Sequence, residues 1–456
     1  SYLLESAESN LRWGRYSFIS FEPYILFSYK KNKTSIIKNG KKRIFNSNFL
    51  FEKLKSLLKQ YKLTKDFKDD TPRFFGGFVG YLGWEVVSLI EEKVKKAKND
   101  KFSDIPDTFL MFNRVVLIYD HYLNKLKAIY LILVEDENLN IEYLYKEATE
   151  KIESVVSTIY TTVTVPKELN FNLNFNEKII KEYKVEKQKK EFIKMVKKAK
   201  EYVVNGDVIQ VVLSNRWIKD INVSPFDIYR ALRTINPSPY MFYLKFDDLI
   251  LIGSSPEILV RKEGDIVETR PIAGTRPRGE TEEKDLYFEK ELINSEKENA
   301  EHIMLFDLAR NDIGKISKYG SITLPQFKII EKFSHVMHIV SSVKGVLKNN
   351  IDCIDVLKAC FPAGTVSGAP KVRAMQIISE LEKTTRGPYA GAVGYFGLNG
   401  NMDMAITIRT IVCKNKKIYI QTGAGIVADS QPEREYKETV NKAKALILAV
   451  KTAEAN

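Results

Sequence analysis

Short apolar segments alternate with long helical segments through the second half of this chain of 456 residues, and this alternation limits the folds open to it. Residues 208–213 form a nearly continuous apolar run of strand length, after a helix that ends at the favourable cap Asn205 and Gly206. Further strands are predicted at 249–252, 336–343, 405–413 and 418–422, and helices at 284–309 and 432–451. Strands interleaved with long helices indicate an α+β or mixed α/β protein whose core lies in its second half.

The first part of the chain is predicted to contain a mixture of strands and helices. Residues 16–29 and 115–134 have the composition of strands, and residues 50–61 have that of a helix. The stretch 158–186 has little apolar periodicity and contains Pro166, so it is predicted to be a linker. We therefore expect an N-terminal mixed α/β region at 1–165 and a second region at 186–456. The chain begins at Ser1 without a charged leader, which favours a trimmed start over a signal peptide.

Composition excludes several classes of protein. No run of about 18 uncharged apolar residues occurs, so no transmembrane helix is expected. The three cysteines stand singly and the four histidines form no HExxH pair, which argues against a zinc enzyme and favours a reducing, cytoplasmic setting. The net charge of +13 comes partly from lysine clusters at 93–98 and 187–200. Apolar residues recur at helical spacing within the second cluster, so we read its lysines as a solvated helix face, with nucleic-acid binding as the alternative.

Two acidic pairs are candidates for metal binding. Glu298 and Glu301 are three residues apart in one predicted helix, and Glu435 and Glu438 are three apart in another, so each pair shares a helix face. The second helix is expected to begin with Ser430 as its cap. Acidic pairs on helices are commonly solvent-exposed residues without a specific function. Two pairs beside glycine-rich or strongly patterned segments nevertheless suit Mg²⁺, which takes one or two protein carboxylates and leaves room for an anionic substrate.

Three other segments favour anion binding. At 419–426 a strand opens into Gly-Ala-Gly, where small residues allow backbone N–H groups to approach an anion, although a structural turn is the plain alternative. Residues 271–279 combine Pro, Gly and Arg without the spacing of a P-loop, and 360–371 begin a helix with free N–H groups. Arg409 and His338 are expected on strands, where an inward-facing charge suggests a substrate carboxylate and an edge position is the alternative.

Together these segments resemble the chorismate-utilising enzymes, a family that includes anthranilate, aminodeoxychorismate, isochorismate and salicylate synthases. The resemblance covers nearly the whole chain. Its marks are RPIAGTRPRG at 270–279, ENAEH at 298–302, DLARND at 307–312, FPAGTVSGAPK at 361–371 and TGAGIVADSQPEREYKET at 422–439. It implies the family's α+β fold, with two packed β-sheets surrounded by helices, and Mg²⁺-dependent chemistry on chorismate.

The resemblance also implies roles for single residues. Glu301 and Glu438 would hold Mg²⁺, supported by Glu298 and Glu435. Glu257 would be the general acid for the departing C4 hydroxyl. His338 and Thr365 would assist the later loss of pyruvate. The residues expected to bind substrate are Thr275, Tyr389, Arg409, Gly423, Ala424, Gly425 and Lys442.

Two positions favour the anthranilate-forming branch of the family. Members that add water resemble one another in carrying a lysine, the base for that water, where this chain has Gln210. Ammonia needs no such base, so Gln210 favours an ammonia-using member. Aminodeoxychorismate synthases often carry a lysine where this chain has Ala273. The resemblance therefore implies an anthranilate-forming enzyme that acts early in tryptophan biosynthesis, with aminodeoxychorismate synthase as the alternative.

Regulation and partners follow from the same resemblance. Two segments look like the tryptophan-binding elements of feedback-inhibited anthranilate synthases; their residues are Leu4, Glu5, Ser6, Pro239, Tyr240 and Met241. A packed structural junction is the alternative reading. None of the three cysteines lies in a glycine-flanked nucleophile turn, so ammonia must come from solution or from a glutamine amidotransferase subunit (component II). A hetero-oligomer is expected, without nucleic-acid or membrane partners.

Overall fold

A computed structural model covers the chain. It describes every residue except 8–13, 47–48, 62, 64–71, 98, 103, 135–139, 163–167, 172–174, 176, 334–335 and 456. In the described residues, no helix combines the length and the apolar character that crossing a membrane requires.

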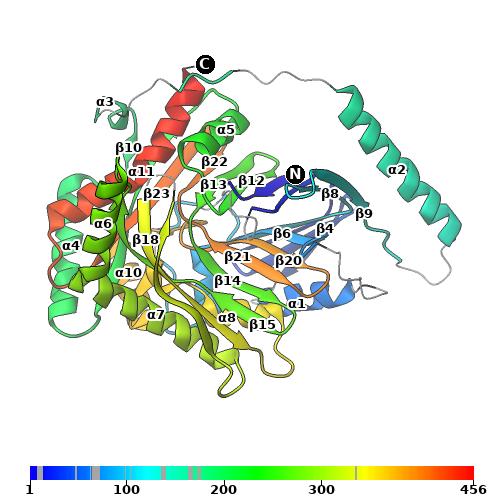
Figure 1. Ribbon diagram of the computed structural model, residues 1–456. Helices are drawn as coiled ribbons and strands as arrows, with labels where there is room; N and C mark the ends of the chain where they lie inside the picture. Colours follow the sequence, from blue (N-terminus) through cyan, green and yellow to red (C-terminus); the bar gives the residue numbers. More distant parts are fainter. Residues whose placement is uncertain are drawn as a thin grey trace.

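Two large, mainly antiparallel sheets organise the molecule (Figure 1). In spatial order, the first sheet consists of β10 (Lys184–Val185), β11 (Gln210–Asp220), β23 (Lys417–Ile426), β22 (Thr410–Lys414), β13 (Leu249–Ser255), β12 (Tyr240–Phe246), β1 (Tyr2–Glu5), β2 (Tyr16–Ser20), β8 (Val115–Asp120) and β9 (Lys125–Tyr130), with β19 (Gly368–Ala369) paired to β11. The second consists of β16 (Ile272–Pro277), β18 (Val336–Val346), β15 (Ile266–Thr269), β14 (Ile258–Glu263), β21 (Met402–Ile406), β20 (Ala392–Gly397), β6 (Gly77–Leu82), β7 (Thr108–Asn113), β3 (Pro23–Lys30), β4 (Lys33–Lys38) and β5 (Lys41–Asn46), with β17 (Thr323–Lys332) paired to β18. Both sheets contain strands from 1–165 and from 186–456.

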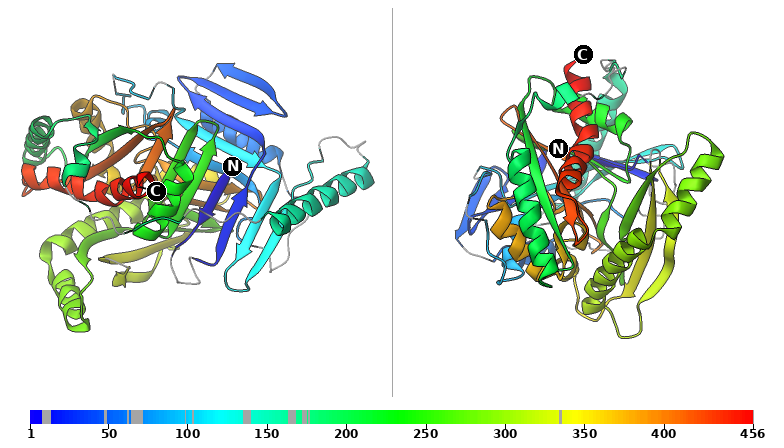
Figure 2. Two further views of the ribbon diagram at one scale, coloured as in Figure 1. Left: turned by 90° about the horizontal axis from the view of Figure 1, so that it is seen from above. Right: turned by 90° about the vertical axis from the view of Figure 1, so that its left-hand side faces the viewer.

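Helices cover the outer surfaces of the sheets. They are α1 (Leu50–Gln60), the 3₁₀ helix η1 (Trp84–Leu89), α2 (Ile141–Thr161), α3 (Glu177–Ile180), α4 (Lys189–Val204), α5 (Pro225–Ile235), α6 (Glu282–Asn294), α7 (Glu296–Ile316), α8 (Cys353–Cys360), α9 (Gly364–Ser367), α10 (Lys371–Glu382) and α11 (Pro432–Glu454). Most pack closely on the body, whereas α2 extends along its outside (Figure 2). The expected α+β fold, with two packed sheets surrounded by helices, is confirmed.

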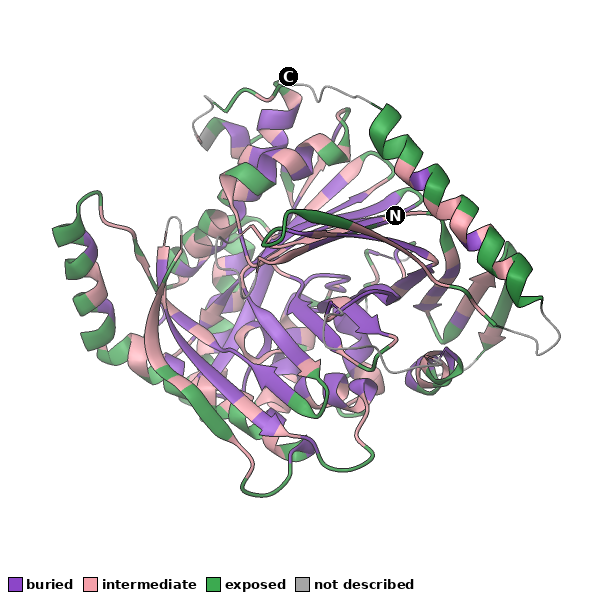
Figure 3. Cartoon of the chain, turned by 45° about the vertical axis from the view of Figure 1, so that its right-hand side comes forward, coloured by how far each residue is buried: buried purple, intermediate pink, exposed green. Residues whose placement is uncertain are grey.

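A hydrophobic core fills the space between the sheets. One cluster joins Phe242 and Leu251 of the first sheet to Val79, Tyr81 and Met111 of the second. Each such fully buried side chain contributes about 1.5–3 kcal/mol relative to an exposed one. Figure 3 shows the buried residues gathered along the strands and the exposed residues on the outer faces of the helices.

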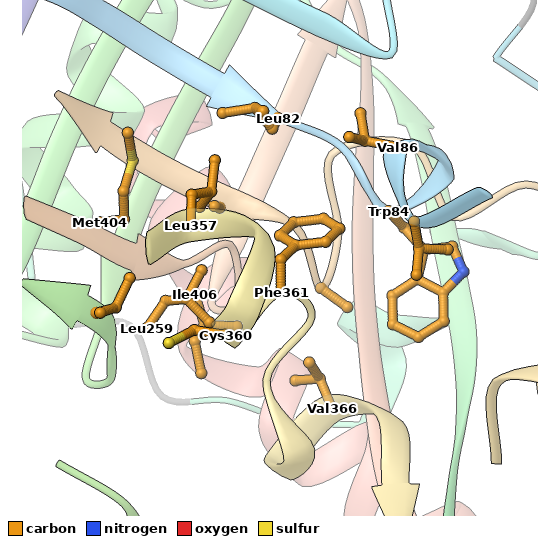
Figure 4. Close-up of a cluster of buried hydrophobic side chains, with 14 of the residues drawn as sticks. Leu82, Trp84, Val86, Leu259, Leu357, Cys360, Phe361, Val366, Met404 and Ile406 are labelled. Atoms are coloured by element: carbon orange, nitrogen blue, oxygen red, sulfur yellow. The ribbon is translucent and has the colours of Figure 1, made fainter. Parts of the chain in front are cut away.

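A second cluster supports the short helix α9. It brings Phe361, just after α8, and Val366 of α9 against Trp84 of η1 and Ile406 of β21 (Figure 4). Because α9 has only four residues, its position depends on this packing rather than on its own hydrogen bonds. Thr365 lies within α9, so the core fixes one of the predicted site residues.

Several predicted elements differ from the structure. The helix expected at 284–309 is two helices, because Ser295 ends α6 and caps α7 through the backbone N–H of Glu298. The predicted linker at 158–186 begins inside α2 and includes α3 and β10. The N-cap position of α11 is Gln431, whose side chain makes no capping hydrogen bond, and not the predicted Ser430. The hydroxyl of Ser430 instead accepts a hydrogen bond from the backbone N–H of Val427.

The strand predicted at 405–413 was also wrong. β21 ends at Ile406 in one sheet, and β22 begins at Thr410 in the other. Arg409 lies in the connection with φ of 51°, in the left-handed region, and not on a strand. Apolar residues continue through this stretch because both strands are buried, so their pattern does not mark the change of sheet.

Candidate active site

Helices α7 and α11 bring the two predicted acidic pairs together. Burial raises the pKa of Glu301, and the charges of Glu298 and Glu438 raise it further. Burial also raises the pKa of Glu435, again with Glu438 as a nearby charge. Glu298 is paired with Arg276 at 3.1 Å. In the described part of the chain, no three His, Cys, Asp or Glu side chains lie close enough to enclose a metal ion.

Glu301 is the carboxyl group at the centre of this arrangement. Its Oε1 accepts a long hydrogen bond of 3.5 Å from Nε2 of Gln210. Glu438 is already paired with Lys442, whose Nζ lies 2.7 Å from Oε1. A cation between α7 and α11 would relieve the repulsion that raises the pKa of Glu301. The carboxylate donors suit a hard divalent ion such as Mg²⁺, which needs only one or two of them.

Strand β23 lies close to three side chains that are predicted to belong to the active site, those of Tyr389, Gln210 and Lys442. A Cβ atom at Gly423 would lie 2.7 Å from the hydroxyl of Tyr389, and one at Gly425 would lie 2.5 Å from Nε2 of Gln210. Glycine, which has no Cβ, leaves room for both side chains. Lys442 donates from Nζ to the carbonyl of Gly423 at 3.0 Å. The side chain of Ala424 packs in the hydrophobic core, so it could meet a ligand only through its backbone.

Glu257 follows β13 and is buried. Burial raises its pKa to about 8, against the opposing effects of the Thr365 hydroxyl and the Lys442 ammonium. Its carbonyl accepts a hydrogen bond of 3.0 Å from the backbone N–H of Ile406, which ties it to the end of β21. A carboxyl group with this pKa still carries its proton near neutral pH and can act as an acid.

His338 on β18 is held in one orientation. Its Nδ1 lies 2.7 Å from the carbonyl oxygen of Gly274 and 3.2 Å from the hydroxyl of Thr275. Since a carbonyl oxygen only accepts, Nδ1 carries the proton and Nε2 remains available as a base. Burial lowers the pKa of His338, and the nearby charge of Arg409 lowers it further, so the ring is neutral at physiological pH.

Arg409 reaches the same region from the connection between the sheets. Its Nη1 donates to the carbonyl of Lys442 on α11 at 2.7 Å. Burial lowers its pKa, and Tyr389 and Glu438 act in the opposite direction. A half-buried guanidinium beside a tyrosine hydroxyl and glycine backbone suits the carboxylate of a ligand.

Comparison with known proteins agrees with this arrangement. A family model described as "chorismate binding enzyme" matches residues 3–448. The chain belongs to this family. Anthranilate synthase component 1 of Aquifex aeolicus (strain VF5) is 50% identical over 457 residues, covering 99% of this chain and 89% of that protein. That of Acetivibrio thermocellus is 47% identical over 456 residues, covering 99% and 90%. The crystal structure of anthranilate synthase component I from Streptococcus pneumoniae TIGR4 superposes with a TM-score of 0.82 at 35% identity, covering 95% of this chain and 92% of that one. The family resemblance and the enzymatic nature of the chain are thereby confirmed.

This chorismate-binding enzyme has a cavity between the sheets that shares no lining residue with the candidate active site and is called the second cavity below. It brings together the two segments predicted to bind tryptophan. All six residues line it: Leu4, Glu5, Ser6, Pro239, Tyr240 and Met241. Glu5 accepts a hydrogen bond of 2.9 Å from Nε of Arg233. The hydroxyl of Tyr240 donates to Asp403 at 2.9 Å. The cavity therefore has apolar walls with fixed polar groups, as small-molecule sites commonly do.

Sequence reasoning missed the other walls of this cavity. They are Arg15, Tyr16, Phe18, Arg73, Phe242, Arg261, Val393, Gly394, Tyr395, Asp403 and Ala405. No local pattern marks these residues, because they come from distant segments that meet only where the two sheets pack. The buried pair of Arg261 and Asp403, 2.8 Å apart, is the clearest signal once the fold is known.

Proposed function

We propose that this chain is the chorismate-using subunit of an anthranilate synthase. It converts chorismate and ammonia to anthranilate, pyruvate and water, the first step of tryptophan biosynthesis. The observation that carries the proposal is the convergence of a protonated acid at Glu257, a neutral base at His338 and the carboxylates of α7 and α11, with Gln210 in place of a water-activating lysine. The similarity to proteins named anthranilate synthase component 1 supports it.

The residues would act in sequence. Ammonia attacks C2 of the ring, the C4–oxygen bond breaks, and Glu257 gives its proton to the departing hydroxyl, which leaves as water. His338 then takes the proton from C2 through Nε2, and the C3–oxygen bond breaks to give the aromatic ring. The released enolpyruvate takes up a proton and becomes pyruvate. Arg409, Tyr389 and the backbone at Gly423 would hold the enolpyruvyl carboxylate throughout.

A magnesium ion is part of the proposal. Glu301 and Glu438 would hold it, with Glu298 and Glu435 behind them, and it would neutralise the ring carboxylate and fix the ring in place. We further propose that ammonia comes from glutamine through a separate amidotransferase subunit, that the enzyme is cytoplasmic, and that tryptophan binds the second cavity as a feedback inhibitor.

The direct test uses the purified chain with chorismate, Mg²⁺ and excess ammonium at mildly alkaline pH, followed by anthranilate fluorescence. A rising signal that EDTA and tryptophan each suppress supports the reaction, the metal and the regulation. Chorismate consumed without fluorescence indicates aminodeoxychorismate synthase, the alternative that Ala273 disfavours. No consumption with free ammonium contradicts the proposed reaction.

The pH dependence tests Glu257. Only the protonated carboxyl can act as an acid, and its pKa is about 8. At a fixed concentration of free ammonia, we expect kcat/KM for chorismate to fall about tenfold per pH unit above that value. Glu257→Gln should lower kcat/KM by about 10²–10⁴-fold and remove this decline. A wild-type profile that stays flat up to about pH 10 would contradict the assignment.

A substitution in the second cavity tests the regulatory site. Ser6→Phe should fill part of the cavity and raise the tryptophan concentration for half-inhibition at least about tenfold, a loss of about 1.4 kcal/mol of binding. Ser1→Phe is the matched control, because Ser1 and Ser6 flank the two ends of β1 and Ser1 does not line the cavity. It should keep wild-type inhibition. Equal inhibition of both variants would place the tryptophan site elsewhere.

A further inference from the structure

Arg386 is a charged side chain that the reaction described above does not use, and it is 1% exposed. It lies between α10 and β20. Its guanidinium forms a two-pronged ion pair with Glu382, through Nε at 2.9 Å and Nη2 at 2.7 Å. It also donates to two backbone carbonyls, from Nη1 to Val366 at 2.9 Å and from Nη2 to Val212 at 2.7 Å.

Both carbonyls belong to segments that carry candidate site residues. Val366 directly follows Thr365 in α9, the short helix that has little stability of its own. Val212 pairs with Gly425 across β11 and β23, and its Cγ1 lies 3.2 Å from the position of a Cβ at Gly423. One rigid guanidinium thus joins α9 to the strand pair β11 and β23. The part of β23 at Gly423 and Gly425 is called the glycine wall below.

The third connection runs along the chain to Tyr389. This residue is three positions after Arg386, and its ring centroid lies 5.6 Å from the guanidinium carbon. The backbone between them is held from the other side by Glu85 of η1, which accepts hydrogen bonds from Arg386 N at 2.8 Å and Gly387 N at 3.0 Å. The hydroxyl of Tyr389 is the atom that approaches Gly423.

The partner carboxylate is fixed as well. Oε1 of Glu382 accepts from the backbone N–H of Ser214 at 2.7 Å and from its hydroxyl at 2.9 Å. The ring of Trp84 lies 4.3 Å from the guanidinium carbon and closes the remaining side. Buried ion pairs contribute little net stability compared with apolar packing. Such complete bonding is better explained by a need for fixed geometry.

We infer that Arg386 is a positioning residue for the reaction on chorismate. It sets the relative positions of Thr365, Tyr389 and the glycine wall, three parts of the site that come from separate segments. A lysine cannot reproduce this role, because its single ammonium lacks the planar fork that bonds one carboxylate and two carbonyls together. The inference rests on the proposed function for the identity of the substrate.

Arg386→Lys is the test, and Arg114→Lys is the matched control. Arg114, between β7 and β8, also bonds a carboxylate and a backbone carbonyl, with Nη1 3.3 Å from Glu147 and Nε donating to the carbonyl of Leu131 at 3.2 Å. None of these partners is a candidate site residue or a contact of Arg386. Misplacement of reacting groups by about 1 Å lowers rates by roughly 10²-fold. We therefore expect kcat to fall about 10²-fold in Arg386→Lys with KM for chorismate within about threefold of wild type. The control should keep the wild-type kcat.

Chorismate consumption and product identity are measured separately, so the two proposals can fail separately. Product other than anthranilate from the wild type would overturn the proposed function, whereas the ratio of consumption rates tests Arg386. A kcat in Arg386→Lys within about twofold of the control would overturn the positioning role. If Arg386→Lys does not fold, Glu382→Gln is the deciding variant, because glutamine keeps the shape of the glutamate side chain. We expect its kcat to be about tenfold lower than that of the wild type. An unchanged kcat would contradict the inference.

Discussion

Glu438→Gln is expected to lower kcat about 10²–10³-fold without unfolding the protein, the size of loss seen when a charge-stabilising group is removed from a site. Glutamine keeps the shape of the side chain but removes the negative charge that acts on Glu301, Glu435 and Arg409. It also leaves Lys442 without its partner at 2.7 Å. Anthranilate fluorescence over a series of Mg²⁺ concentrations, together with circular dichroism of the fold, measures both parts of the prediction.

A control on the same helix separates the site from general charge effects. Glu433 is exposed in the first turn of α11, so Glu433→Gln removes an equal charge away from the site. It should retain wild-type turnover and the same Mg²⁺ dependence. Activity retained by Glu438→Gln, at any Mg²⁺ concentration, would remove Glu438 from the proposed metal site.

His338→Ala should slow the second stage of the reaction, the loss of pyruvate, without stopping the first. With Nδ1 held by the carbonyl of Gly274, the free Nε2 is the base that we expect to remove the ring proton. Loss of a positioned base commonly lowers a proton-transfer step by about 10²–10⁴-fold. Pyruvate release should slow while chorismate is still consumed, so the amino-substituted intermediate should accumulate. Chromatography with mass detection, alongside a pyruvate assay, follows both compounds.

The matched control for this variant is His121→Ala. That histidine follows β8 and is bonded to Ser17 at 2.8 Å, in a part of the first sheet that contributes no candidate catalytic residue. It should form anthranilate without accumulating an intermediate. If His338→Ala also forms anthranilate at the wild-type rate with no intermediate, His338 has no part in pyruvate loss.

The sequence by itself determined those features that depend on neighbouring residues. Spacing of three residues placed Glu298 with Glu301, and Glu435 with Glu438, on single helix faces, and both helices exist. The glycine run in β23 was marked by residue type alone, because close approach of a backbone requires the absence of a Cβ. Motif resemblance supplied the family and the two-sheet fold.

Only the tertiary structure decided which of these features meet. Arg409 was predicted on a strand, since buried strands of two different sheets give one uninterrupted apolar pattern. The raised pKa of Glu257 is an effect of burial, and its burial depends on segments that are far apart in the sequence. The contacts of Arg386 join residues 212, 366 and 382, a separation that no local pattern can encode. Periodicity records which side of an element is buried, whereas the packing of the two sheets determines what lies against it.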